Sequence, residues 1–419
     1  MPFATSPTWE FLIQDNAGGD VADLSAYVMS PSVGPRLSQP SLQTWRLPLI
    51  PEVLALGPFE AGLHRGVAIR NGDVVANDIL WRVKPQGGPS DAYADLEFIG
   101  PMQRWATRYC QDADAQIFDG VSADGSDRGM DLPVGIVANP LMSFAAADML
   151  EQALANTIAI DGDLGIALGT FSTTPNTQNA FMFAMRNLAP CRISELMSAM
   201  REAGACDVMI TPSSGATMGT VSALDRIGID LPGVHFDYGT GANNVAWAYP
   251  ETSMDEFCDK LWYELPPRID TNHFANNVTE DAPGTTTNPS AAQAAFGVYH
   301  DIIVHSGWSG SMYTRLPSGP GDTLPYGGAI NPLYQMYVTR WNAELAARMA
   351  PRQLIRIVPQ PGVAPAPWDD YNLGDTPRLN LGNLGLDVSG AAFRIIGWDA
   401  KPQDDGGEQV DLLIGWAPE

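Results

Sequence analysis

Turn-forming residues divide this chain into short segments, and this pattern limits the folds that it can adopt. Its 419 residues include 41 glycines and 34 prolines, which favour many turns and short elements over a helical bundle. The last segment shows the pattern well, because Val410, Leu412 and Ile414 recur at every second position, as in a half-buried strand. Asp404-Asp405-Gly406-Gly407 supplies the tight turn before it. We therefore expect a β-rich protein.

Residues 1–109 are predicted to form a β-barrel. Its strands are expected at 9–13, 42–49, 66–70, 73–75, 79–83 and 96–98. Asn71-Gly72 lies between two of these runs and is typical of a hairpin turn. In the run that follows, Ile79, Trp81 and Val83 alternate, so Trp81 is expected to lie in the core.

A short helix is expected to close this barrel. Met102, Trp105, Ala106 and Tyr109 have the spacing of one face of a helix, and Gly100-Pro101 precedes them. Such a helix would cover the open end of the barrel.

The middle of the chain is predicted to be an acidic, loop-rich connector at 110–147 followed by a compact α+β module at 148–268. Expected elements are helices at 144–155, 193–203 and 254–259 and strands at 164–171, 207–210, 234–238 and 261–263. The helix at 193–203 is the clearest, because Ile193, Leu196, Met197 and Met200 lie on one side of it.

Residues 269–330 have little regular pattern, which predicts an extended loop or arm. Asn331-Pro332 then starts a long helix, in which Leu333, Tyr337, Trp341 and Leu345 recur every four residues until Pro351 ends it. A strand at 354–358 and a closing barrel complete the region 331–419. Gly374 lies in a tight bend before this barrel.

The formal net charge of −25 argues against a phosphate-binding surface, because nucleic-acid binding depends on clustered lysine and arginine. Solubility explains the charge equally well. No apolar run is long enough to span a bilayer, and residues 1–7 lack the features of a secretory signal. The cysteines, at 110, 191, 206 and 258, are far apart, so we expect buried free thiols in a reducing cytoplasm.

Four motifs could carry chemistry, and each departs from the pattern that its chemistry needs. The segment 307–311 lacks the last glycine of a nucleophile elbow, and 239–244 lacks the third glycine of a dinucleotide fingerprint. His273, His300 and His305 do not have zinc-site spacing, and the acidic loop 119–131 lacks the spacing of a calcium-binding loop. No catalytic, cofactor-binding or metal residue is predicted. Paired carboxylates among the 48 acidic residues, or a sugar platform among the 11 tryptophans, stay open as alternatives.

Several segments resemble the tail-hub proteins of phages with long, non-contractile tails, which are also known as minor tail or baseplate hub proteins. At the end of the chain these are DYNLGD, FRIIGWDA and VDLLIG, which follow one another from residue 370 to 415. Further upstream they are CRISELMSAMREAGACDVMITP, GVHFDYGTGANNV, MDEFCDKLWYELPPRIDTNHFANNVT and NPLYQMYVTRWNAELAARMAPRQLIRIVPQPG. Together they cover about half of the chain, and their order supports the resemblance more than any one of them.

The resemblance implies an α+β, β-rich fold with two hub-type β-barrels, an inserted α+β module that shares strands with the second barrel, and the long helix before the closing barrel. It implies a homotrimeric ring at the distal tail tip of the virion, assembled in the host cytoplasm. The ring would contact the distal tail protein, the tape-measure protein and tip or fibre proteins, and let the genome pass without specific DNA binding. The family pattern supplies no catalytic residue. The alternative is an acidic cell-surface hydrolase or carbohydrate-binding tail protein; a host cytosolic enzyme is disfavoured because no cofactor motif is present.

Overall fold

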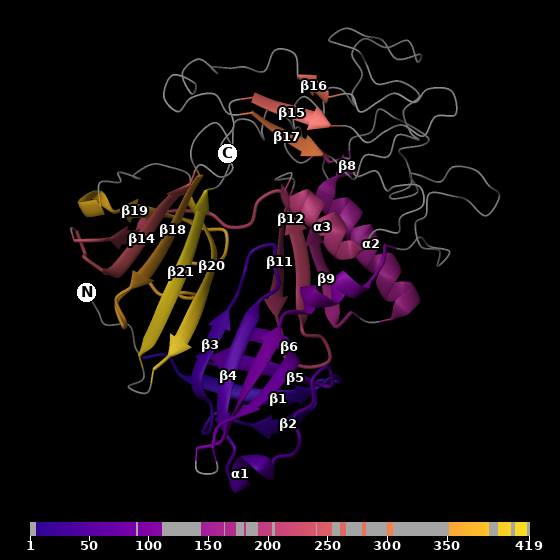
Figure 1. Ribbon diagram of the computed structural model, residues 1–419, viewed down its shortest axis with the longest axis vertical. Coiled ribbons are helices and arrows are strands. Elements are labelled where there is room, and N and C mark those ends of the chain that lie inside the picture. The colour runs from indigo at the N-terminus through magenta and orange to yellow at the C-terminus, as the bar shows by residue number, and fades with distance from the viewer. Residues whose placement is uncertain are drawn as a thin grey trace, which may run out of the picture.

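The computed structural model contains three packed regions (Figure 1). In that view the first strands form the lower region, the last strands form the left one, and two helices cover the right one. The structure describes residues 6–88, 91–110, 144–162, 164–172, 180–181, 192–202, 206–239, 241–253, 260–264, 279–281, 300–304, 352–384, 393–403 and 407–416. Strands far outnumber helices among them.

The first region contains seven strands and two short helices. They are β1 (Trp9–Asp15), β2 (Asp20–Asp23), β3 (Met29–Gly34), β4 (Leu42–Pro48), α1 (Pro51–Leu54), β5 (His64–Arg70), β6 (Asp73–Gln86), β7 (Tyr93–Ile99) and the 3₁₀ helix η1 (Pro101–Thr107). Asn71 and Gly72 have φ angles of 54° and 88°, the left-handed conformation that a two-residue hairpin turn requires. The predicted hairpin between β5 and β6 is therefore confirmed.

Three features of this region differ from the predictions. The helix expected to close the barrel is the 3₁₀ helix η1, which ends at Thr107 before Tyr109, and its Met102 and Trp105 pack in the core under α2 (Ala146–Asp161) and α3 (Ile193–Glu202). β2 and β3 were not expected, because β2 has only four residues and β3 contains Pro31 and Ser30, which has a positive φ. Trp81 is not a core residue but is 42% exposed. The pairing of β6 with β7 skips Trp81 between Leu80 and Arg82, so a β-bulge turns the tryptophan outward.

The second region packs two helices against a three-stranded sheet. Its elements are β8 (Phe144–Ala145), α2 (Ala146–Asp161), β9 (Ile166–Phe171), β10 (Ala180–Phe181), α3 (Ile193–Glu202), β11 (Asp207–Pro212) and β12 (Gly219–Leu224). As predicted, Ile193, Leu196, Met197 and Met200 are buried. They pack with α2 and with the sheet β11-β12-β9 in one hydrophobic cluster.

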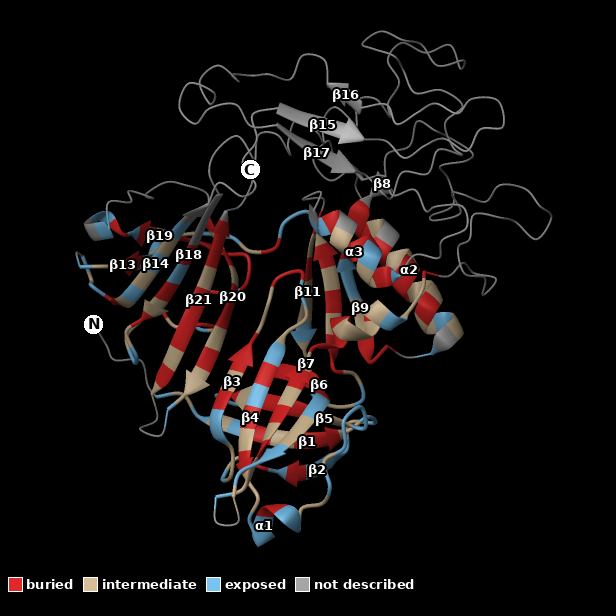
Figure 2. Ribbon diagram, in the orientation of Figure 1, coloured by how far each residue is buried: buried red, intermediate tan, exposed pale blue. Residues whose placement is uncertain are grey.

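The third region contains the end of the chain. Its elements are β13 (Asp230–Asp237), β14 (Val245–Ser253), β18 (Arg352–Pro359), β19 (Thr376–Asn380), the 3₁₀ helix η3 (Gly382–Leu384), β20 (Phe393–Pro402) and β21 (Glu408–Trp416). The predicted final hairpin is confirmed, since β20 pairs with β21 from Phe393↔Trp416 to Pro402↔Glu408. Val410, Leu412 and Ile414 are all buried, as expected for the core face of this strand. Figure 2 shows buried residues along β21.

One sheet joins the first and third regions. Its strand order is β14-β18-β21-β20-β3-β4-β7-β6-β5-β1-β2, and the pair Ala400↔Val33 links its two halves. Two separate closed barrels are not confirmed, because the described strands of these two regions, apart from β13 and β19, join in one open sheet that ends at β14 and at β2.

The expected arm at 269–330 contains regular structure that its sequence did not indicate. β16 (Thr279–Asp281) and β17 (His300–Val304) pair with β15 (Lys260–Glu264), which was predicted. Their partners are distant in sequence, so no local turn signal marks them. The long helix predicted after Asn331, the short helix at 254–259 and the connector at 111–143 lie outside the described residues.

Candidate functional site at the junction of three cores

Each region has its own hydrophobic core, and the three cores meet at one junction. The first core surrounds Trp45 and Phe98. The middle core lies under α2 and α3. The closing core surrounds Tyr371 and Trp398. A cavity of about 480 Å³ lies between them, where β6, the β11–β12 hairpin and residues 372–375 come together.

Asp78 is a buried ionisable group beside this cavity. Its carboxylate is 1% exposed and accepts hydrogen bonds from Ser41 Oγ at 2.6 Å and Gln43 Nε2 at 2.8 Å. Burial raises the pKa of Asp78 to about 6, although both hydrogen bonds act in the opposite direction. Both hydrogen-bond donors are neutral, so neither supplies a positive charge that would offset the free-energy cost of burying the ionised carboxylate.

The loop between β11 and β12 is attached to the first region by side chains that bind its backbone. Asn77 Nδ2 donates to the Ser213 carbonyl at 2.7 Å, and Arg65 Nη2 donates to the Gly215 carbonyl at 3.0 Å. Gly18 lies so close to Gly215 that a Cβ atom there would overlap the loop backbone. This attachment fixes the middle region against the first.

Two glycines allow the middle region to cross the closing region. Gly228 and Gly374 have φ angles of 92° and 85°. A Cβ on Gly374 would overlap the carbonyl oxygen of Ile227, and one on Gly228 would overlap the backbone of Gly374. The conformation and the close approach both require glycine.

A buried ion pair connects the first region to the final hairpin. Arg70 on β5 is 4% exposed and lies 3.3 Å from Glu408 at the start of β21. It also binds the half-exposed Asp369 at 2.9 Å and lies 5.4 Å from the ring centre of Trp368. Burial raises the pKa of Glu408, and Arg70 lowers it in part. Glu408, at the start of β21, is therefore part of the junction.

Two further arginines cross between regions. Arg36, after β3, binds Asp399 on β20 at 2.6 Å and donates to the Trp398 carbonyl. Arg394 on β20 binds Asp207 on β11. Arg36 and Arg70 thus form ion pairs between the first and closing regions, and Arg394 forms one between the closing and middle regions.

The loop at 239–244 is the one considered motif whose geometry is largely described. Ala242 N donates to Asp237 Oδ2, and Asp237 N donates to Asn244 Oδ1, each at 2.8 Å. These bonds close the loop on itself. The segments 119–131 and 307–311 and both His273 and His305 lie outside the described residues; His300 lies on β17.

Two of the four cysteines are described, and both are buried as predicted. These are Cys110 and Cys206. Burial raises the pKa of Cys206 to about 12, so its thiol stays protonated near neutral pH.

Neither a metal cluster nor a membrane-spanning helix is found in the described part of the chain. No group of three or more His, Cys, Asp or Glu side chains there could hold a metal ion. No helix there is long and apolar enough to cross a membrane.

Sequence reasoning did not find the residues that build this junction. The local sequence gives no sign that the strand residues Asp78, Arg70 and Glu408 are buried charges. Their side-chain partners are 35 to 338 residues away in sequence. Gly374 was found, because a glycine in a tight bend is a local signal.

Comparison with solved structures gives matches along nearly the whole chain. The 43 kDa tail protein of prophage MuSo2 from Shewanella oneidensis matches with a TM-score of 0.54 and 11% identity, covering 98% of both chains. The tail protein from Neisseria meningitidis MC58 matches with a TM-score of 0.53 and 9% identity, covering 97% of this chain and 96% of that one. The fold is that of phage tail proteins.

A third tail-protein structure agrees with this fold. The prophage tail protein gp18 from Listeria monocytogenes EGD-e matches with a TM-score of 0.50 and 11% identity, covering 96% of this chain and 94% of that one. No protein-family profile and no curated protein matches the sequence. The matches thus extend over all three described regions.

Proposed function

We propose that the protein is a structural virion component, a tail-tip or baseplate hub. Three copies form a ring that joins the tail tube and the distal tail protein to the tip and lets the genome pass. The observation that carries this proposal is the match to phage tail proteins over 94% or more of both chains in three structures. The resemblance of the sequence to tail-hub proteins gives the more specific assignment.

The construction of the junction suits a part that bears load. Its contacts are ion pairs, backbone hydrogen bonds and a glycine crossing, with a cavity of about 480 Å³ between the cores. Such contacts hold regions in a defined arrangement. The large sheet leaves β14 and β2 as its ends among the described strands, and closed symmetry is one way to cover sheet edges.

Acidity also agrees with a conduit for DNA. A net charge of −25 would repel a passing polyanion and so prevent it from binding to the wall. The proposed partners are the distal tail protein, the tape-measure protein and tip or fibre proteins. The proposed chain divisions are 1–109, 110–147, 148–268, 269–330 and 331–419.

Antibody labelling of intact phage particles that carry the protein tests its location. A gold-conjugated antibody to this chain should label the distal end of the tail. Labelling of the capsid, or of no particle at all, would contradict a hub.

One observation favours a second function, carbohydrate binding. Trp247 and Tyr249 on β14 are 60% and 54% exposed, and their rings stack at 6.5 Å with an interplanar angle of 19°. Nearly coplanar exposed rings can pack against sugar faces. A polysaccharide pull-down that captures wild type and loses the Trp247→Ala variant would favour this function. Clearing of a cell-wall zymogram would instead indicate a hydrolase.

A further inference from the structure

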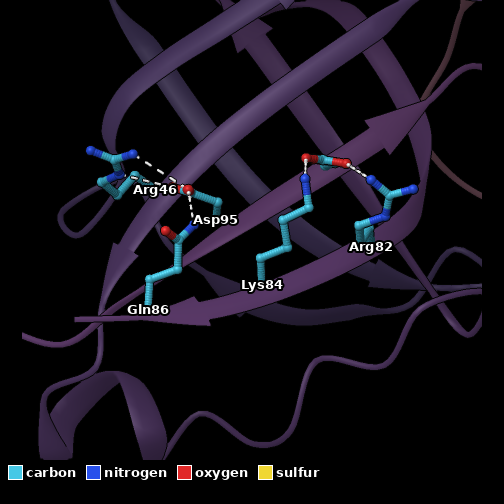
Figure 3. Close-up of polar contacts among 6 residues, drawn as sticks. Arg46, Arg82, Lys84, Gln86 and Asp95 are labelled. Atoms are coloured by element: carbon cyan, nitrogen blue, oxygen red, sulfur yellow. Dashed lines mark hydrogen bonds and ion pairs between the residues drawn. The ribbon is translucent and has the colours of Figure 1, made fainter. Parts of the chain in front are cut away.

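The outward face of three adjacent strands of the large sheet, β4, β7 and β6, combines cations and aromatic rings. Figure 3 shows its cations, Arg46, Arg82 and Lys84. We call this outward face the basic face and define it by Arg46, Trp81, Arg82, Lys84 and Tyr93. Cross-strand pairing places Arg46 opposite Asp95, and Arg82 opposite Glu97. The face is therefore continuous across the three strands.

Ion pairs hold the cations of the basic face in place. Arg46 Nε binds Asp95 at 2.8 Å, and its guanidinium lies 4.2 Å from the ring centre of Tyr93. Glu97 binds Arg82 at 3.2 Å and also binds Lys84. Figure 3 shows the carboxylate between these two cations. Because they remain 42% to 55% exposed, the three cations are ordered and still accessible to a partner.

The β-bulge adds Trp81 to this face. In regular alternation Trp81 and Arg82 would point to opposite sides of the sheet. The bulge leaves Leu80 fully buried, while Trp81 and Arg82 are both exposed. Bulges often redirect a side chain in this way. Tryptophan, tyrosine and arginine, which meet here, are the residue types enriched at the energetic centres of protein interfaces.

The charge of the basic face is unusual for this chain. The whole chain has 48 acidic residues against 23 lysines and arginines, whereas the ion pairs of the basic face join three cations to two carboxylates. Exposed ion pairs contribute about 0–1 kcal/mol each to folding, so stability alone gives little reason for such a cluster. A face with a positive excess is the part of the surface that an acidic protein can approach most favourably.

We propose that the basic face binds an acidic surface on a second copy of this chain. This inference rests on the proposed function and names the contact that builds its ring. A second copy is a suitable partner because the same chain carries both the basic face and a large excess of acidic residues. Its net charge of −25 attracts the basic face of its neighbour. The two surfaces differ, so the contact is head-to-tail, and such contacts close into rings when the rotation allows.

Light scattering on the purified full chain, over a range of protein and salt concentrations, tests this contact. Arg82→Glu combined with Lys84→Glu should weaken trimer formation by about tenfold or more. Trp81→Ala should weaken it by a similar factor without a change of charge. Added salt should weaken the wild-type trimer, because it screens ion pairs at exposed contacts.

Arg378→Glu is the matched control. Arg378 lies on β19, in another sheet, and forms a similarly exposed ion pair with Asp230. Its reversal should leave the trimer unchanged. Melting temperatures of all variants show that each one folds.

The outcomes separate this inference from the proposed function. A wild type that stays monomeric at every concentration would contradict the trimer and hence both proposals. A wild-type trimer that both basic-face changes leave intact would overturn only the basic-face contact. If Trp81→Ala weakens the trimer but the charge reversals do not, the basic face does not bind an acidic surface, and this inference is wrong.

Discussion

At the residue scale, the backbone crossing at Gly228 and Gly374 leaves no room for a Cβ atom on either residue. Gly374→Val adds a β-branched side chain to a left-handed residue whose Cβ would overlap the Ile227 carbonyl oxygen. We expect a loss of about 3 kcal/mol or more, because conformational strain and steric overlap add. Urea denaturation measures it.

Gly362→Ala is the control for the glycine prediction. Gly362 has a φ of 70°, but nothing lies within 4 Å of the position of its Cβ. This variant should lose only about 1–2 kcal/mol from the left-handed conformation. If both variants lose the same free energy of unfolding, the close approach of Gly374 to Ile227 does not contribute to the effect.

Asp78 should make stability depend on pH in a definite direction. Its folded pKa of about 6 lies above the usual value of 3.8. Below about pH 4 the carboxyl is protonated in both states and contributes nothing. Between about pH 4 and 6 the folded state keeps the proton that the unfolded chain has lost, so stability falls as pH rises, and above that range the loss is complete.

Asp78→Asn should remove this dependence. At about 1.36 kcal/mol per pKa unit, the variant should gain about 2 kcal/mol relative to wild type between pH 4.5 and pH 8. Urea denaturation at both pH values measures this difference, in which effects of Glu408 and other carboxylates cancel. If the free energy of unfolding changes with pH in the same way in both proteins, Asp78 does not have a raised pKa in the folded state.

Glu408 should matter more than Asp369, although both bind Arg70. Glu408 and Arg70 are 6% and 4% exposed, whereas Asp369 is 54% exposed. Glu408→Ala leaves a buried guanidinium with one exposed partner and should lose about 3 kcal/mol. Asp369→Ala should lose under about 1 kcal/mol. Thermal or urea unfolding of the two variants compares them; equal losses would contradict the importance of burial.

At the element scale, the bulge in β6 separates two kinds of tryptophan. Trp398 is 1% exposed in the closing core, so Trp398→Ala should lose about 3–5 kcal/mol. Trp81→Ala should change folding stability by under about 1 kcal/mol, because Trp81 points to solvent. Unfolding of monomers at low concentration measures both, and a large loss for Trp81 would place it in the core after all.

Local patterns predicted the elements whose signals are local. The Asn71-Gly72 hairpin, the apolar face of α3 and the alternation in β21 depend on neighbouring residues, and all three are present. The bulge at Trp81 was missed because an extra residue in a strand shows only in its pairing with β7. β17 was missed because its partner, β15, is distant in sequence. β2 and β3 have nearby partners, but β2 has only four residues and β3 contains Pro31 and a positive φ at Ser30, so neither shows a regular strand pattern.

The candidate site was less predictable than the elements for the same reason. The Arg70–Glu408 pair spans 338 residues, and a charge in a strand pattern does not reveal that it will be buried. The single sheet that joins both halves of the chain depends on the pairing of β3 with β20, which no local signal indicates. Two separate barrels were therefore the natural expectation from sequence.

At the scale of the whole molecule, the three regions act as one body that is suited to assembly. The junction fixes their arrangement, the large sheet leaves β14 and β2 at its ends, and the basic face offers a contact to an acidic neighbour. These features agree with the proposal that the protein functions as an assembly of several copies around an axis.

Electron cryomicroscopy of the intact tail tests the central claim most directly. The account predicts density for this fold at the distal tip, in three copies around the tail axis, with the basic face of each copy against its neighbour. Density for the fold at another place in the particle, or a single copy at the tip, would contradict it.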